Sequence, residues 1–229
     1  MVDMRMLARR EVLFTNLTAL IAGFAMFGSV VLVPVFVETP RGYSASVQQV
    51  VHYGFDACAT KAGLYLLPSA ITLLFAGPFA GLLGKRLGSK WPLASGMFLV
   101  AASAGSLAIW HDHPWQILAP MPVLGVGVGF AFAAMATLIT EAVRPTETGV
   151  ATGMNTVMRT VGGVIGGEMG AALLASHTIP GTKTPSVVGF EIAFAISAVA
   201  ALVGAGVAVL VTPLRKRERL HTAEVSPTS

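Results

Sequence analysis

Six long apolar runs dominate this sequence and restrict it to one kind of fold. Each run has about the 20 residues that a helix needs to cross the roughly 30 Å hydrocarbon core of a bilayer. The first four contain no Asp, Glu, Lys or Arg. The runs are too long for strands and lack the alternation of membrane strands. We therefore predict six transmembrane helices, at residues 12–37, 62–84, 91–110, 115–140, 150–176 and 189–212.

The composition indicates the same class. Hydrophobic residues make up 54% of the 229 residues, and charged residues make up only 11%. Soluble domains carry about 25% charged residues, and disordered chains combine low hydrophobicity with high net charge, so both classes are excluded. The single cysteine, Cys58, cannot form a disulfide within the chain. The sequence predicts an all-α polytopic membrane protein embedded in a lipid bilayer.

The positions of Lys and Arg predict the orientation of the helices, because cytoplasmic loops carry an excess of these residues. The first apolar run is longer than the 7–15 residues of a signal-peptide core, so we expect it to be retained. With the N-terminus inside, the outer side holds only Arg41, Lys61 and Lys183. The inner side holds Arg5, Arg9, Arg10, Lys85, Arg86, Lys90, Arg144, Arg215, Lys216, Arg217 and Arg219.

This bias predicts that both termini are cytoplasmic. The chain then divides into a cytoplasmic N-terminus (1–11), a six-helix transmembrane bundle (12–212) and a basic cytoplasmic tail (213–229). We interpret the tail as a topology anchor that also contacts anionic lipid, and we expect no nucleic-acid binding.

Arg159 is the most informative residue within the apolar runs, because a charge at a helix centre costs roughly 2.5–3.5 kcal/mol on insertion scales. At about 100° per residue, it shares one face of its helix with a stripe of small and polar residues. The stripe predicts a wall of a translocation pathway. A buried structural pair that joins two helices, or a side chain that reaches the interface, is the alternative. The stripe consists of Thr152, Asn155, Gly163, Gly166 and Gly170.

Glu168 lies in the same apolar run but cannot pair with Arg159. Nine residues separate the two, which is about 180° around a straight helix and about 13 Å along it. Glu168 is therefore a candidate proton relay, and a glutamate satisfied locally near the outer headgroups is the alternative.

Signatures of soluble enzymes are weak in this sequence. His111, Asp112 and His113 stand together in a short turn without further metal-ligand spacing. No phosphate loop, nucleophile elbow or dinucleotide fingerprint occurs. We therefore expect neither catalysis nor a cofactor.

The segment from Gly77 to Lys90 resembles the cytoplasmic-loop motif of the major facilitator superfamily, which runs roughly G-x-x-x-D-R-x-G-R-K between consecutive helices. Gly81, Arg86, Gly88 and Lys90 match this motif, and Lys85 stands where the aspartate is expected. A second resemblance follows from Gly149 to Gly166, whose spacing of Gly, Asn155 and Arg159 is similar to the penultimate helix of fourteen-helix drug:proton antiporters.

The resemblance covers nearly the whole chain, as the last six helices of such a transporter. It implies the C-terminal half of a proton-coupled multidrug exporter in the plasma membrane, acting on lipophilic small molecules. Such a half implies a separate N-terminal half or a homodimer, since these transporters bind substrate between two bundles. The alternatives are a truncated, non-transporting fragment of such a transporter and a six-span channel or scaffold of another class.

Overall fold

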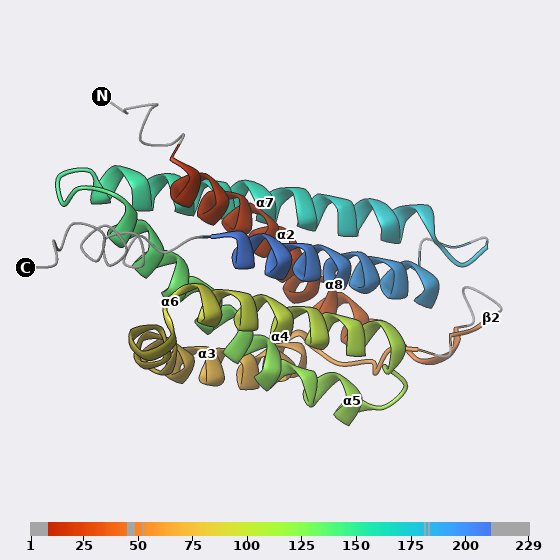
Figure 1. Ribbon diagram of the computed structural model, residues 1–229. Helices are drawn as coiled ribbons and strands as arrows, with labels where there is room; N and C mark the ends of the chain where they lie inside the picture. The colour runs from red at the N-terminus through yellow and green to blue at the C-terminus, as the bar shows by residue number, and fades with distance from the viewer. Residues whose placement is uncertain (1–8, 45–48, 52, 181, 183, 212–229) are drawn as a thin grey trace, which may run out of the picture.

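The computed structural model describes residues 9–44, 49–51, 53–180, 182 and 184–211. The described chain forms an elongated bundle of long helices that run side by side, with one short helix and a small hairpin (Figure 1). This architecture confirms the predicted all-α fold class. The long helices are α2 (Arg10–Glu38), α3 (Ala59–Leu87), α4 (Lys90–Ile109), α6 (Pro120–Ala142), α7 (Thr148–Ser176) and α8 (Val187–Leu210).

Five stretches of helix are long and apolar enough, by length and composition, to cross a membrane: α2, α3, α4, α8 and the segment Pro114–Ala142 that ends with α6. The sixth, α7, has 29 residues but is the least apolar, because Gly and Thr recur along it and it carries Arg159 and Glu168. It lies beside α2 along the bundle (Figure 1). That α7 crosses the membrane remains a prediction from its length and packing.

The predicted fourth span is divided at its start into α5 (Pro114–Leu118) and α6. Pro120 and Pro122 lack the N–H groups that would continue the helical hydrogen bonds across this point. Ala119 between the two helices keeps helical dihedrals, with φ −62° and ψ −40°, so the chain direction is maintained.

A small hairpin in the loop after α2 was not anticipated from the sequence. Strands β1 (Gly42–Ser44) and β2 (Gln49–Val51) pair antiparallel, with Gly42 opposite Val51. The chain then returns to the bundle at Gly54, whose φ of +82° suits glycine. Tyr53 and Ala57, on either side of this return, are buried at that end of the bundle.

The surface of the bundle carries large apolar side chains on its long helices. On α3, Leu74 is 71% exposed, and Phe75 and Phe79 are also exposed. A contiguous apolar surface of this kind would drive association in water, whereas lipid tails are as apolar as these side chains. The interior, in contrast, combines small residues with a few fully buried large ones such as Met97 and Phe194.

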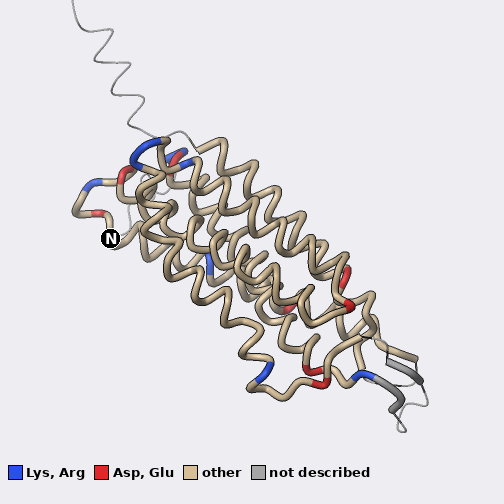
Figure 2. The backbone as a smooth tube through the Cα atoms, turned by 90° about the horizontal axis from the view of Figure 1, so that it is seen from below, with Lys and Arg blue, Asp and Glu red and all other residues tan. Residues whose placement is uncertain are grey.

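Most of the charged residues lie toward the two ends of the bundle (Figure 2). Figure 2 shows Lys and Arg concentrated at the end where the described chain begins. Lys85, Arg86 and Lys90 lie there at the junction of α3 and α4. The basic tail expected at 213–229 lies outside the described residues. The concentration of Lys and Arg fits the predicted orientation, in which this end of the bundle is cytoplasmic. The orientation remains a prediction.

Candidate translocation site

The face of α7 that carries Asn155 packs against α2 through a buried pair of asparagines. Asn155 is 5% exposed, and its side-chain amide donates a hydrogen bond to Oδ1 of Asn16 at 3.1 Å. The same amide lies 3.5 Å from the backbone oxygen of Thr15. In a membrane, such a bond between two helices contributes about 0.6 kcal/mol on average. Asn155 therefore joins α7 to α2.

Glycines bring the backbones of the same two helices into direct contact beyond this pair, toward the C-terminal end of each helix. A Cβ added at Gly162 would overlap the carbonyl oxygen of Leu20 and lie 2.7 Å from its carbonyl carbon. A Cβ at Gly166 would likewise lie 2.9 Å from the carbonyl carbon of Phe24, and one at Gly23 would overlap the carbonyl oxygen of Arg159. Only glycine permits this approach, so the glycines of the predicted stripe pack against α2.

Arg159 extends from this crossing toward α6. Its guanidinium carbon lies 4.1 Å from the centroid of the Phe132 ring, which is a close cation–π contact. Among the residues that the structure describes, Arg159 has neither an ion-pair partner nor a side-chain hydrogen bond. The residue is half-buried. The guanidinium is attached about 16 Å along α7 from the start of the helix, and its N–H donors are available to another partner. It can therefore attract an anionic group or a hydrogen-bond acceptor.

The other polar residues of α7 divide between two faces. Thr152 is half-buried near Asn155, and its hydroxyl donates to the Thr148 carbonyl at 2.8 Å. The hydroxyls of Thr156 and Thr160 also bond to carbonyls one turn earlier, although both residues are exposed. The O–H donors of these threonines are therefore used within the helix, and only the lone pairs of their hydroxyl oxygens remain for partners outside it.

Glu168 lies away from Arg159, as the helical spacing predicts. It is exposed, whereas the small residues on the Arg159 face, Gly163 and Gly170 among them, are buried. Within the described chain, no ion pair includes Glu168. The structure thus separates the two ionisable groups of α7, and the proton-relay role of Glu168 stays a prediction.

The residues of the predicted cytoplasmic-loop motif lie at the α3–α4 junction. Gly88 ends α3 with a φ of +90°, which explains a glycine at this position of so short a turn. Lys85 and Arg86 are exposed in the last turn of α3, where cations complement the helix dipole. Gly81 is exposed, and a Cβ there would meet no atom within 4 Å, so packing inside this bundle does not require it.

The opposite end of the bundle is closed by an aromatic cluster around Phe36. The rings of Tyr53, Phe190 and His111 lie 5.5, 5.2 and 5.6 Å from it. Tyr53 donates its hydroxyl hydrogen bond to the Pro185 carbonyl. Burial raises the pKa of the Tyr53 hydroxyl, and a hydrogen bond with the Thr39 side chain opposes part of that rise. His111 Nε2 also lies 3.5 Å from the carboxylate of Glu191, which joins the turn after α4 to α8.

Two residues that complete the candidate site were missed by the sequence analysis. Asn16 lies in the first apolar run, where an asparagine between Thr15 and Thr18 is a polar signal that could have been recognised. Phe132 carries no such signal, because one aromatic residue in an apolar helix is ordinary. The described residues contain no group of three or more His, Cys, Asp or Glu that could hold a metal ion.

The fold and the site together define a class: a multi-pass α-helical membrane protein with polar groups where α2 and α7 meet. The chain belongs to the Major Facilitator Superfamily, whose family model matches residues 18–228. It is therefore a member of a family of transmembrane transporters and not of a family of enzymes.

The chain is distantly similar to proteins named for drug resistance. It is 25% identical over 149 residues to "Multidrug resistance protein B homolog" of Mycobacterium tuberculosis, covering 63% of this chain and 25% of that protein. It is 28% identical over 153 residues to "Methyl viologen resistance protein SmvA" of Salmonella typhimurium, covering 66% of this chain and 28% of that protein. The chain thus spans about a quarter of the length of these relatives.

Solved structures support the fold. Tetrameric PepTSo2 superposes with a TM-score of 0.66 at 19% identity, covering 88% of this chain and 40% of that chain. A peptide transporter POT superposes with a TM-score of 0.66 at 15% identity, covering 93% of this chain and 43% of that chain. At these identities the likeness concerns the fold alone, and this chain spans less than half of each of those chains.

Proposed function

We propose that this chain forms one six-helix bundle of a proton-coupled exporter of lipophilic small molecules in the plasma membrane. It works against a second bundle, which is either a separate N-terminal half or a second copy of this chain. Both termini are cytoplasmic. The proposal is supported by the family, by relatives named for multidrug and methyl viologen resistance, and by the length of those relatives.

The observation that carries this proposal is the position of Arg159. A half-buried guanidinium in a span is costly, and pairing with a carboxylate would be the ordinary structural reason to keep it. In the described residues its contact is the face of Phe132, at 4.1 Å, and not a carboxylate. We assign Arg159 to the pathway, where it receives an acceptor group of the substrate or of the facing bundle. Asn155 and Thr152 position the helix that carries it.

The test is drug accumulation in the host of this gene. In a deletion strain, the wild-type chain should lower accumulation of methyl viologen or of a fluorescent lipophilic cation, and an uncoupler should abolish the effect. Arg159→Ala should restore full accumulation at unchanged membrane abundance, because both the charge and its donors are lost. Arg159→Lys, which keeps the charge but not the planar fork, should retain part of the export.

Two results would contradict the proposal. If deletion of the gene changed neither accumulation nor resistance, the chain would be a non-transporting member of the family. If Arg159→Ala exported normally at wild-type abundance, the pathway role of Arg159 would be wrong even though transport itself was established. Thr156→Val, an exposed change on the same helix whose hydroxyl bonds within the helix, is the matched control.

A further inference from the structure

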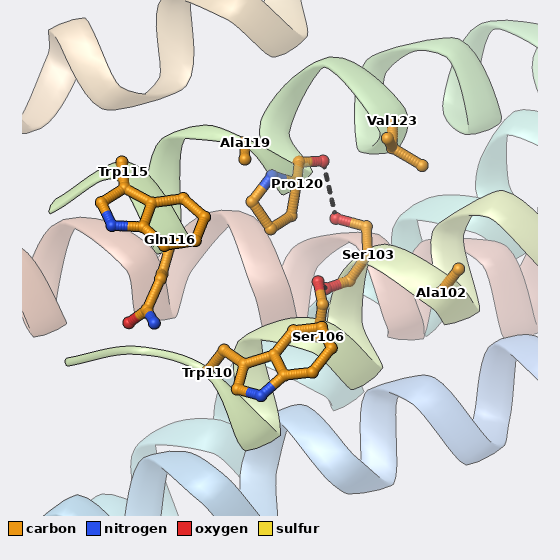
Figure 3. Close-up of a pocket in the computed structure, with 9 residues that line it drawn as sticks. All are labelled: Ala102, Ser103, Ser106, Trp110, Trp115, Gln116, Ala119, Pro120 and Val123. Carbon is orange, nitrogen blue, oxygen red and sulfur yellow. Dashed lines mark hydrogen bonds between the residues drawn. The ribbon is translucent and has the colours of Figure 1, made fainter. Parts of the chain in front are cut away.

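A groove of about 340 Å³ opens on the side of the bundle between α4 and the α5–α6 segment (Figure 3). Its volume lies within the range of roughly 300–1,000 Å³ that is typical of small-molecule sites. Ala102, Ala119, Pro120 and Val123 provide apolar walls. Its base is fixed by one interhelical bond, in which the Ser103 hydroxyl donates to the Pro120 carbonyl at 2.9 Å. The groove is therefore a built feature of the α4–α6 contact.

The groove is continuous with the surface that faces lipid. On α4, Phe98, Ala102 and Ile109 are exposed and fall within about 40° of one another around the helix. Ala102, in the middle of this stripe, is also a wall of the groove. In a multi-pass membrane protein, an exposed apolar stripe of this kind contacts hydrocarbon. The groove consequently opens into the bilayer and not into water.

The two ends of the groove differ in chemistry. Figure 3 shows Trp110, Trp115 and Gln116 toward one end, and Ala102 and Val123 toward the other. Indole rings favour the boundary between hydrocarbon and headgroups, so the first end lies at the membrane interface and the second lies deeper. An occupant must therefore be apolar along its length and polar at one end.

The interfacial end offers hydrogen-bond donors. Each indole has an N–H and no acceptor. The Gln116 carbonyl oxygen accepts from the backbone N–H of His113 at 2.9 Å, which directs its NH₂ group elsewhere. Within the described part of the chain, no hydrogen bond runs from these indole N–H groups or from the Gln116 NH₂ group, and both tryptophans are exposed. Phospholipid headgroups present ester and phosphate oxygens, which are acceptors, at this depth.

We propose that this groove is a binding site for one membrane phospholipid, whose acyl chain fills the apolar walls and whose ester or phosphate oxygens meet the Trp110, Trp115 and Gln116 donors. An apolar recess open to hydrocarbon must either be filled or lose the contacts of its lining atoms. Transfer of an acyl chain from the bilayer gains no hydrophobic free energy, because both environments are apolar. Shape and the polar end therefore distinguish this lipid from its neighbours. This inference does not depend on transport.

The test uses the full purified chain in vesicles of phosphatidylethanolamine and phosphatidylglycerol that carry a trace of phosphatidylglycerol with a photoreactive acyl chain. After irradiation, adducts are mapped by mass spectrometry. Adducts should concentrate on residues 102–123 relative to the α8 face at Val199 and Val203, where both side chains are exposed.

Substitutions that fill the groove provide the decisive comparison. Ala102→Trp should remove the excess of adducts, and Ala119→Trp should do so from the opposite wall if the first variant fails to fold. Phe98→Trp changes the same exposed stripe one turn away from the groove and should leave the excess intact. Labelling spread evenly over α4, α6 and α8, or an excess that survives both filling variants, would overturn the proposal. So would labelling by a photoreactive lipophilic cation that added phospholipid does not reduce, because the groove would then be a substrate site.

Discussion

The glycine crossing of α2 and α7 can be tested by adding a single carbon atom. Gly162→Ala places a Cβ against the Leu20 carbonyl group, which is backbone and cannot rotate away. Gly153→Ala makes the same chemical change on the same helix, at an exposed position where a Cβ meets no atom within 4 Å. Both substitutions gain the same helix propensity, up to about 1 kcal/mol, so this gain cancels in the comparison.

The magnitude follows from the distances at the crossing. The added Cβ would lie 2.7 Å from the Leu20 carbonyl carbon, about 0.7 Å inside the 3.4 Å at which ordinary contact begins. The carbonyl oxygen is closer still, so α7 would move outward by at least that amount, and the 3.1 Å bond between Asn155 and Asn16 would lengthen to about 3.8 Å or more, beyond hydrogen-bond range. Overpacking costs about 1–3 kcal/mol, and loss of the interhelical bond adds about 0.6 kcal/mol.

We therefore expect Gly162→Ala to be less stable than Gly153→Ala by about 1.6–3.6 kcal/mol, the sum of these two costs. The assay is reversible unfolding of the purified chain in mixed micelles, followed by Trp fluorescence, with the native fraction compared at matched denaturant. Equal stability of the two alanine variants would refute the reasoning, because it would show that the helices do not approach at Gly162.

Three further predictions follow from the site and from the aromatic end of the bundle. In a double-mutant cycle, Asn16→Ala and Asn155→Ala should couple by about 0.6–1.7 kcal/mol, and simple additivity would contradict the bond between them. The contribution of Tyr53 to the stability of the fold should decrease at alkaline pH, because the folded state favours the neutral hydroxyl. This contribution is fully present below the ordinary tyrosine pKa of about 10 and is lost as the pH rises through the raised pKa of the folded state. Tyr53→Phe should lower the stability by about 1 kcal/mol at neutral pH, because the hydrogen bond to Pro185 is lost. The variant should also remove the loss of stability at alkaline pH, which thermal melting between pH 8 and 11 measures. An unchanged alkaline loss in the variant would contradict the assignment to Tyr53. Glu168→Gln should leave thermal stability unchanged, since Glu168 is exposed without an ion pair in the described chain, and any proton-relay role would appear as a changed pH dependence of export.

Much of the fold could be predicted from the sequence because the bilayer imposes one rule. Backbone groups in hydrocarbon must bond internally, so apolar runs of about 20 residues become helices. This rule placed α2, α3, α4, α6 and α8 close to their observed bounds. It could not anticipate the hairpin of β1 and β2, because strand pairing outside the spans depends on local turn geometry. Nor could it anticipate the boundary between α5 and α6, where Pro120 interrupts hydrogen bonds without redirecting the chain.

The candidate site was predictable only where helical spacing determines it. The shared face of Asn155, Gly163, Gly166 and Gly170 follows from their spacing, and the structure buries all four. What that face meets depends on which helices are neighbours, and periodicity within one helix carries no such information. The contact of Arg159 with Phe132 on α6 therefore required the structure. The functional role of this face remains a prediction that export measurements must decide.

The central claim is that six helices cross the membrane, and α7 is the helix on which it depends most. Cysteine accessibility in intact cells tests this directly. In a Cys58→Ser background, one cysteine is introduced at Arg144, before α7, and another at Ser176, its last residue; both positions are exposed. A membrane-impermeant maleimide should label the cysteine at 176 in intact cells and the cysteine at 144 only after permeabilisation. Labelling of both positions from the same side would show that α7 does not cross, and the six-span bundle would be wrong.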